Sequence, residues 1–331
     1  MILNFFLPAN LTTNLSLELS YSSPKWTAKK ILRKTGISSR PIAGDMLVSD
    51  MAVKAAEGLF EENGIDRSTV DFLLLCTQSP DYYLPSTACI VQDRLGLPTT
   101  SGALDFNLGC SGFVYGLSLA KGLLSGGIAQ NVLLITSETY TKHIHPMDRS
   151  TRTIFGDGAA AVLISREDLP NIGNFVLGTD GSGYKNLIVP SGGMAIPRSE
   201  ETAKEQTDES GNIRSKDNLY MNGPEIFSFT LRTVPDMIHQ VLERNGLKQE
   251  NVDHFVFHQA NRFILESLRD KLSIPEEKFV IDVEETGNTV SPTIPIAIKR
   301  AMEKGRIKKG DKILIAGFGV GYSWGATILQ L

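Results

Sequence analysis

Continuous apolar stretches alternate with stretches of helical periodicity along most of this chain. The apolar runs are rich in valine, isoleucine, leucine and alanine; examples are residues 72–76, 131–138 and 312–319. Uninterrupted runs of this kind are typical of strands that are buried on both faces of a sheet. The pattern therefore predicts an α/β fold in which largely parallel sheets are covered by helices on both faces.

The chain also repeats its own pattern. Residues 63–78 (NGIDRSTVDFLLLCTQ) and 245–260 (NGLKQENVDHFVFHQA) match without gaps, and both follow a helical segment. In this register Cys76 aligns with His258. The strand-like runs that follow correspond as well, with 103–110 matching 278–288. A repeat on this scale predicts two similar α/β halves, which we assign to residues 1–170 and 171–331.

Residues 190–220 separate the matching parts of the two halves. They are polar and charged, and they show no clear periodicity. Segments of this length without secondary structure are uncommon inside compact domains. We therefore expect a long surface segment at the junction of the halves.

Composition and charge narrow the functional class. The 331 residues include 33 Lys and Arg against 37 Asp and Glu, with a net charge of -4, which argues against a nucleic-acid binder. No apolar run approaches the ~18 residues of a membrane span, and the N-terminus lacks the basic region of a signal peptide. The three cysteines show neither metal-ligand spacing nor a secreted disulfide framework. We expect a cytoplasmic protein without membrane insertion.

Cys110 is the first candidate for catalysis. It lies between a strand-like run and a helix-like run in DFNLGCSGFVYGLSLAKGL, residues 105–123. The start of a helix carries unpaired N–H groups and a partial positive charge, which favour a thiolate over a thiol. The small neighbours Gly109, Ser111 and Gly112 allow a tight turn and a close approach of a substrate carbonyl to backbone N–H groups. A free cysteine can also be an ordinary core residue, so Cys110 alone does not define a site.

His258 and Asn288 strengthen the case for a site. His258 ends an apolar strand of the second half, and Asn288 lies at the junction that corresponds to that of Cys110, one residue out of simple register. Corresponding strand ends in such a repeat converge near the pseudo-twofold axis. The duplication therefore predicts that Cys110, His258 and Asn288 meet at one buried point.

Several segments along nearly the whole chain together resemble the thiolase superfamily, and specifically the 3-oxoacyl-ACP synthase III family. The segments are RKTGISSR, LPSTACIVQDRLGL, LDFNLGCSGF, DRSTRTIFGDGAAAVL, LYMNGPEIFSFTLRTVP, HQAN, GNTVSPTIPIA and GFGVGYSWGATILQL. The resemblance implies a thiolase-like duplicated fold with five layers, αβαβα, and a homodimer. It also implies that Cys110, His258 and Asn288 form a catalytic triad.

The family chemistry is a decarboxylating Claisen condensation that initiates fatty-acid synthesis. The resemblance implies that Cys110 takes an acyl group from acyl-CoA, with the N–H groups of Cys110 and Val320 as the oxyanion hole. Malonyl-ACP would follow, and a neutral His258 protonated on Nε2 would donate to its thioester carbonyl together with Asn288. This chemistry requires no metal or redox cofactor. His143 and His145 in HIHP are a weak metal pair because no further ligands accompany them.

Other positions carry over with departures from the family pattern. Arg149 matches the arginine that flanks the CoA adenine, and Lys34 replaces a family arginine. Leu84 falls where the neighbouring subunit contributes an acyl-pocket residue, and Phe318 is a further candidate for substrate binding. The family tryptophan on the other adenine face is replaced by Lys30, with Trp26 further upstream.

The carrier-binding surface is predicted on the segment after HQAN. Acyl carrier proteins are acidic, and Arg262, Arg269 and Lys271 form a local basic patch that could attract one. Arg262 lies one position earlier than the corresponding family arginine. The same charges could also be an ordinary solvated helix face.

Four alternatives remain beside the fatty-acid initiator. A specialised relative could serve a polysaccharide or secondary-metabolite pathway. A degradative thiolase would need a second cysteine in the loop GFGVGYSWG, which has none. A type III polyketide synthase shares the triad but is usually longer. A silent carrier-binding subunit would typically lack the nucleophile, whereas Cys110 is present.

Overall fold

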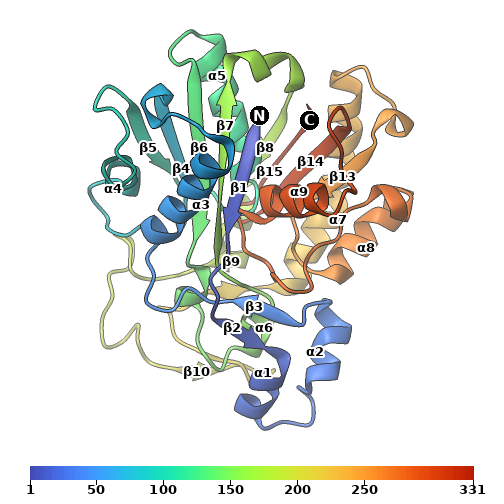
Figure 1. The fold of residues 1–331 in the computed structure, drawn as a ribbon. Coiled ribbons are helices and arrows are strands. Elements are labelled where there is room, and N and C mark those ends of the chain that lie inside the picture. The colour runs from blue at the N-terminus through green and yellow to red at the C-terminus, as the bar shows by residue number, and fades with distance from the viewer.

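Two β-sheets organise the chain, and the structure, a computed structural model, describes residues 1–331 (Figure 1). The first sheet has the order β1 (Ile2–Phe6), β7 (Gly158–Ser165), β6 (Asn131–Glu138), β4 (Phe72–Cys76) and β5 (Gly102–Phe106). The second sheet has the order β13 (His254–Phe257), β14 (Lys312–Gly319), β15 (Ser323–Gln330) and β8 (Val176–Thr179). The predicted boundary between the two halves, at residue 170, falls between β7 and β8 along the chain. The exact position of this boundary stays a proposal.

The sheets are mixed, so the prediction of largely parallel sheets is wrong. The ladders β4–β5, β4–β6 and β13–β14 are parallel. The ladders β1–β7, β6–β7, β14–β15 and β15–β8 are antiparallel. Between β14 and β15 only Val320, Gly321 and Tyr322 remain, and a connection this short can join only antiparallel strands.

Helices make three further layers. Helices α5 (Gly112–Ser125) and α9 (Thr293–Glu303) pack between the sheets and contact strands of both. Helices α3 (Val48–Asn63) and α4 (Thr87–Arg94) cover the outer face of the first sheet. The outer face of the second sheet packs against α7 (Gly223–Arg244), on which α8 (Arg262–Lys271) lies. The prediction of a five-layered αβαβα fold is confirmed.

The central helices are buried because their sequences are apolar on several faces. Phe113, Val114 and Leu117 of α5 belong to one core cluster together with Ile294 and Ile298 of α9. This cluster also contains strand residues from both sheets. The two halves therefore share a core, and the segments that start the two central helices are held at their common boundary.

One predicted strand of the second half is almost lost. Residues 278–288 were expected to match β5, but they form only two isolated bridges, one between Phe255 and Phe279 and one between Phe155 and Asn288. The Gln259 side chain donates to the carbonyls of Phe257 and Val280, and it accepts from the N–H of Asp282 at 2.7 Å. Because this amide uses the groups that a ladder would need, strand pairing stops there.

A smaller lobe lies at one end of the sheets, at the bottom of Figure 1. It contains α1 (Asn14–Tyr21), α2 (Ala28–Thr35), α6 (Arg149–Arg152) and the β2–β3 pair (Leu11–Thr13, Ser39–Pro41). The segment 190–220 also contributes short strands: β10 (Gln206–Thr207) pairs with β11 (Ile213–Arg214), and β12 (Tyr220–Met221) pairs with β9 (Leu187–Ile188). No helix of the chain has the length and apolar character needed to cross a membrane.

Candidate active site

A cavity of about 500 Å³ is lined by residues of both halves. Side chains of α2, α7 and α8 form part of its walls. Its walls include Cys110, His258 and Asn288, together with Lys34 and Phe318. Most of the other lining side chains are apolar. The structure thus brings three predicted catalytic residues and two predicted substrate-binding residues to one cavity.

Cys110 lies in a turn that the second half holds tightly. The turn precedes α5, whose N-cap is Ser111, and Cys110 is buried. Gly319 of β14 lies so close that a Cβ atom there would be 2.9 Å from the Cβ of Cys110 and 3.1 Å from its Sγ. A Cβ on Gly317 would be 2.7 Å from the Cys110 carbonyl oxygen. Glycines in β14 are therefore what allows the nucleophile turn to pack against the second sheet.

Burial protonates the Cys110 thiol in the resting cavity. The loss of solvation raises its pKa well above the ordinary value, and the nearby Glu138 carboxylate raises it further. The expectation that the helix start favours a thiolate is therefore wrong for the resting state, because desolvation outweighs the effect of the backbone N–H groups. A proton must leave the sulfur as it attacks.

His258 follows β13 and is held edge-on to Phe318, with ring centroids 5.8 Å apart. It is buried, and desolvation lowers its pKa to about 3. Its Nδ1 atom lies 2.7 Å from the Thr293 hydroxyl, which in turn lies 2.9 Å from the Val290 carbonyl oxygen. The hydrogen bond between Nδ1 and the Thr293 hydroxyl therefore fixes the orientation of a neutral imidazole ring.

The Thr293 hydroxyl is compatible with both neutral tautomers of His258. When the hydroxyl donates to the Val290 carbonyl, it accepts from Nδ1–H and leaves Nε2 with a lone pair. When the hydroxyl turns to donate to Nδ1, the ring proton is on Nε2. The predicted Nε2–H form is therefore one of two forms that the same contacts support.

Asn288 is oriented by a turn just before α9. Its Oδ1 accepts from the Val290 N–H at 2.8 Å, which assigns that atom as the oxygen. Val290 has a φ of 66°, an unusual conformation for a β-branched residue and a frequent sign of a functional site. The Nδ2 group has no hydrogen-bond partner in the chain, so it can donate into the cavity.

A buried carboxylate ties this turn to the first half. Ser291 donates to Oε1 of Glu138 at 3.0 Å, and Glu138 also accepts from the Gln78 N–H and the Ser79 hydroxyl. Burial raises the pKa of Glu138 to about 8. Glu138 is the one charged residue of its strand, and that contrast was the one sequence signal that could have found it. Nothing in the sequence pattern distinguished Thr293.

The second predicted oxyanion donor, Val320, lies beside the cavity wall without lining the cavity. Its Cγ1 atom would be 2.5 Å from a Cβ on Gly109, so it packs against the nucleophile turn. Neither the N–H of Cys110 nor that of Val320 has a hydrogen-bond partner within the chain. Both donors are thus unused by the fold.

Leu84 and Arg149 lie outside the cavity. Leu84 is 83% exposed, in a run of exposed apolar side chains with Tyr82 and Tyr83. Arg149 lies over the Tyr21 ring at 5.6 Å, and its Nε is buried without a hydrogen-bond partner. Trp26 packs edge-on against Tyr21, and Lys34 lies 5.4 Å from the Trp26 ring.

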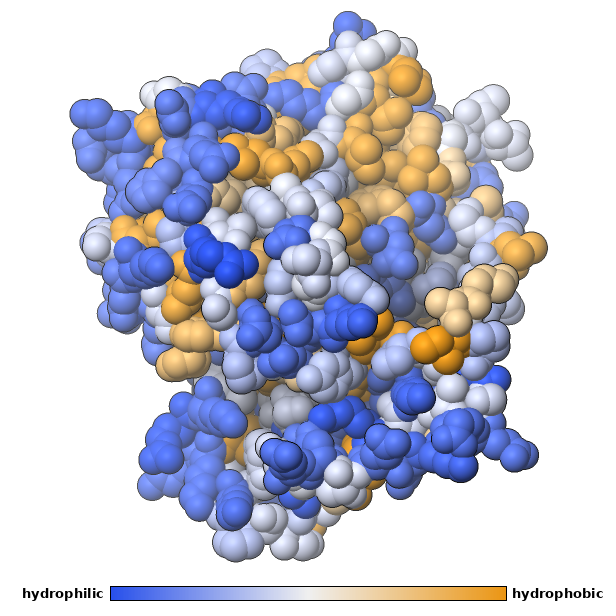
Figure 2. Space-filling view, turned by 180° about the vertical axis from the view of Figure 1, so that it is seen from behind, coloured by the Kyte–Doolittle hydropathy of each residue, from blue (hydrophilic) through white to orange (hydrophobic).

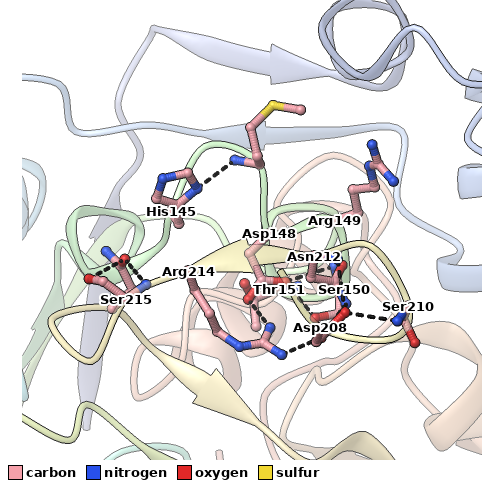
Figure 3. A network of polar contacts seen from close by, with 12 residues as sticks. His145, Asp148, Arg149, Ser150, Thr151, Asp208, Ser210, Asn212, Arg214 and Ser215 are labelled. Atoms are coloured by element: carbon pink, nitrogen blue, oxygen red, sulfur yellow. Dashed lines mark hydrogen bonds and ion pairs between the residues drawn. The ribbon is translucent and has the colours of Figure 1, made fainter. Parts of the chain in front are cut away.

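Figure 3 shows how the segment 190–220 is fastened beside Arg149. Arg214 bonds to the buried Asp148 at 2.8 Å and also pairs with Asp208. Asp148 in addition caps the start of α6 by accepting from the Ser150 N–H. This part of the segment is therefore an anchored hairpin rather than a loosely attached surface loop.

The predicted carrier-binding arginines are paired with carboxylates. Arg262 lies 3.4 Å from Glu284, and Arg269 lies 2.9 Å from Asp270. His145, from the weak metal pair, bonds to Glu205 at 2.9 Å. No group of three potential metal ligands is found in the chain.

Family models match two parts of the chain. The model of the 3-oxoacyl-[acyl-carrier-protein (ACP)] synthase III family matches residues 104–181, and the model of its C-terminal part matches residues 242–331. The first contains Cys110, and the second contains His258 and Asn288. The matched parts thus include all three polar residues of the cavity.

Full-length relatives agree with these matches. A beta-ketoacyl-[acyl-carrier-protein] synthase III from Caldanaerobacter subterraneus subsp. tengcongensis is 38% identical, over 98% of this chain and 95% of the relative. A crystal structure of a 3-oxoacyl-(acyl-carrier-protein) synthase III is 49% identical, with a TM-score of 0.97 over 99% of this chain and 98% of the other. The priming beta-ketosynthase of the R1128 polyketide pathway is 30% identical, with a TM-score of 0.86 over 100% and 95%. The chain therefore belongs to the 3-oxoacyl-ACP synthase III family of condensing acyltransferases.

Proposed function

We propose that this chain joins an acyl group from acyl-CoA to the two-carbon unit of malonyl-ACP, with loss of CO₂, and so initiates fatty-acid synthesis. The observation that carries the proposal is the meeting of Cys110, His258 and Asn288 in one buried, mostly apolar cavity. An apolar cavity with a few polar groups suits an acyl chain with a reactive thioester at its end.

In the first step Cys110 attacks the thioester carbon of acyl-CoA. The sulfur–carbon bond to the enzyme forms, and the bond to the CoA sulfur breaks. His258, with its Nε2 lone pair, accepts the thiol proton, which then leaves with CoA as its free thiol. The free N–H groups of Cys110 and Val320 support a role in binding the oxyanion.

In the second step the carboxylate of malonyl-ACP leaves as CO₂, and its electron pair forms an enolate. For this step the ring proton of His258 moves from Nδ1 to Nε2 by exchange with water, and the Thr293 hydroxyl then donates to Nδ1. Asn288 Nδ2 and His258 Nε2–H donate to the enolate oxygen. The enolate carbon attacks the acyl carbonyl on Cys110, the bond to the Cys110 sulfur breaks, and 3-oxoacyl-ACP is released. The Cys110 thiolate then takes up a proton from solvent. His258 is neutral at the start of each step, since desolvation lowers its pKa to about 3, so its Nε2 can offer a lone pair in the first step and an N–H in the second.

The CoA and dimer contacts extend the proposal beyond the cavity. Lys34, at the cavity wall, and the neighbouring Trp26 and Arg149 would hold the nucleotide end of CoA. In a homodimer, the exposed Leu84 would reach the acyl pocket of the second subunit. We expect the enzyme to act in the cytoplasm.

The test is intact-protein mass spectrometry after incubation with acetyl-, branched-chain or octanoyl-CoA, with Cys110→Ala as the control. We expect a mass gain of one acyl group that is absent from the control. Addition of malonyl-ACP should then discharge it as a 3-oxoacyl product, and the acyl-CoA that reacts names the primer. No mass gain with any acyl-CoA would contradict the proposal.

A further inference from the structure

The segment around α2 carries an unusual concentration of positive charge. Between Leu19 and Gly44 the chain has no acidic residue, whereas the whole protein has a net charge of -4. The cations of this segment are Lys25, Lys29, Lys30, Arg33, Lys34 and Arg40. All of them except Arg40 are exposed. We call Lys25, Lys29, Lys30, Arg33 and Lys34 the α2 patch.

The charges of the α2 patch are not neutralised by the fold. None of its residues forms an ion pair within the chain. The contrast is with α8, where Arg262 and Arg269 each have a carboxylate partner. The nearby Glu18 accepts from the Ala28 N–H at 2.6 Å at the start of α2. Like charges on neighbouring turns of an exposed helix repel each other, and no carboxylate of the chain offsets that repulsion within an ion pair.

The α2 patch borders the entrance of the candidate active site. Lys34 belongs to the cavity wall. At the end of α2, the side chain of Arg262 lies so close to Gly36 that a Cβ there would be 2.3 Å from the Cβ of Arg262. The lobe that contains α2 lies at the bottom of Figure 1, and on the face seen in Figure 2 the lower part of the molecule is covered mostly by hydrophilic residues.

We propose that the α2 patch is the docking surface for the acidic acyl carrier protein that delivers the malonyl group, an inference that rests on the proposed function. The cations extend over the whole helix, about 12 Å at 1.5 Å per residue. This length suits a protein surface with several carboxylates better than a single phosphate group. Complementary charge of this kind mainly accelerates encounter and orients the partner.

The test compares Lys29→Glu/Arg33→Glu with Lys308→Glu/Lys309→Glu. Both double variants change the charge equally, and all four positions are exposed. Lys29 and Arg33 do not line the cavity. The rate of condensation is measured with malonyl-ACP and with malonyl-CoA as acceptor, each from low to high salt, and acylation of Cys110 by acyl-CoA is followed by mass spectrometry.

We expect kcat/KM for malonyl-ACP to fall roughly tenfold at low salt in Lys29→Glu/Arg33→Glu, with a weaker salt dependence. The control variant should change by less than about twofold at every salt concentration. The malonyl-CoA reaction and Cys110 acylation in Lys29→Glu/Arg33→Glu should change by less than about twofold at high salt, where the attraction of CoA to the patch is screened, and by less than the malonyl-ACP reaction at low salt. An equal effect of both double variants, or an equal loss with malonyl-CoA, would overturn the docking role. Loss of acylation in the unmodified protein would instead overturn the proposed function.

A lipid surface is the competing partner, because Leu15 and Leu19 of the neighbouring α1 are exposed. Sedimentation with phosphatidylglycerol vesicles separates the two. Vesicle binding that Lys29→Glu/Arg33→Glu abolishes, with unchanged kinetics for malonyl-ACP, would assign the patch to lipid and contradict the proposal.

Discussion

The two halves hold their contributions to the cavity in different ways. Cys110 of the first half is placed by close packing, because Gly317 and Gly319 of β14 leave room for its turn. Asn288 of the second half is placed by hydrogen bonds, from the Val290 N–H to its own oxygen and from Ser291 to Glu138. The equivalent junctions of a duplicated fold have thus acquired different supports. A nucleophile needs an exact distance to a carbonyl, whereas a donor needs a fixed direction.

Gly319→Ala should have the largest effect among changes outside the triad. Its new Cβ would lie 2.9 Å from the Cβ of Cys110, so the nucleophile turn must move. A displacement of about 1 Å can cost roughly 100-fold in rate, and we expect a loss of that order in the acylation rate constant. The matched control is Gly122→Ala in α5, where a Cβ meets nothing within 4 Å. Equal acylation rates in the two variants would show that packing against β14 does not position Cys110.

Thr293→Val should have a smaller effect, because it removes the hydroxyl that holds His258 in the second half. The variant keeps the shape but leaves the buried Nδ1 of His258 without a partner. An unpaired buried group costs about 1–3 kcal/mol, so condensation should slow about tenfold or more. Thr293→Ser, which retains the hydroxyl, should restore most of the rate. An unchanged condensation rate in Thr293→Val would show that Thr293 does not position His258. So would a rate in Thr293→Ser as low as that in Thr293→Val.

Glu138→Gln should have the smallest effect, and this effect should be a change in how the free energy of unfolding depends on pH. Because the folded-state pKa is raised from 4.5 to about 8, the folded protein holds a proton that the unfolded chain releases between these values. Glu138 therefore makes the free energy of unfolding fall as pH rises from about 4.5 to about 8, by at most about 1.4 kcal/mol per pH unit. Chemical denaturation at several pH values should show a flatter profile in the variant. An unchanged profile would mean that Glu138 titrates normally.

The repeat in the sequence was sufficient to predict where the halves meet. Matching 63–78 with 245–260 placed His258 at a strand end, and the second matched junction placed Asn288 opposite Cys110. Hydrophobic pattern alone could not predict the mixed strand directions or the loss of pairing near Gln259, since both depend on contacts between distant residues. The protonation of Cys110 was mispredicted because burial is a tertiary property.

The central claim is that the first half forms the acyl-enzyme and the second half consumes it. The most direct test follows His258→Ala and Asn288→Ala by intact-protein mass spectrometry, first with the reacting acyl-CoA and then with malonyl-ACP. We predict that both variants gain the acyl group, more slowly in His258→Ala, and that both retain it after malonyl-ACP is added, while the unmodified protein is discharged. Discharge of either variant at the unmodified rate would contradict the account.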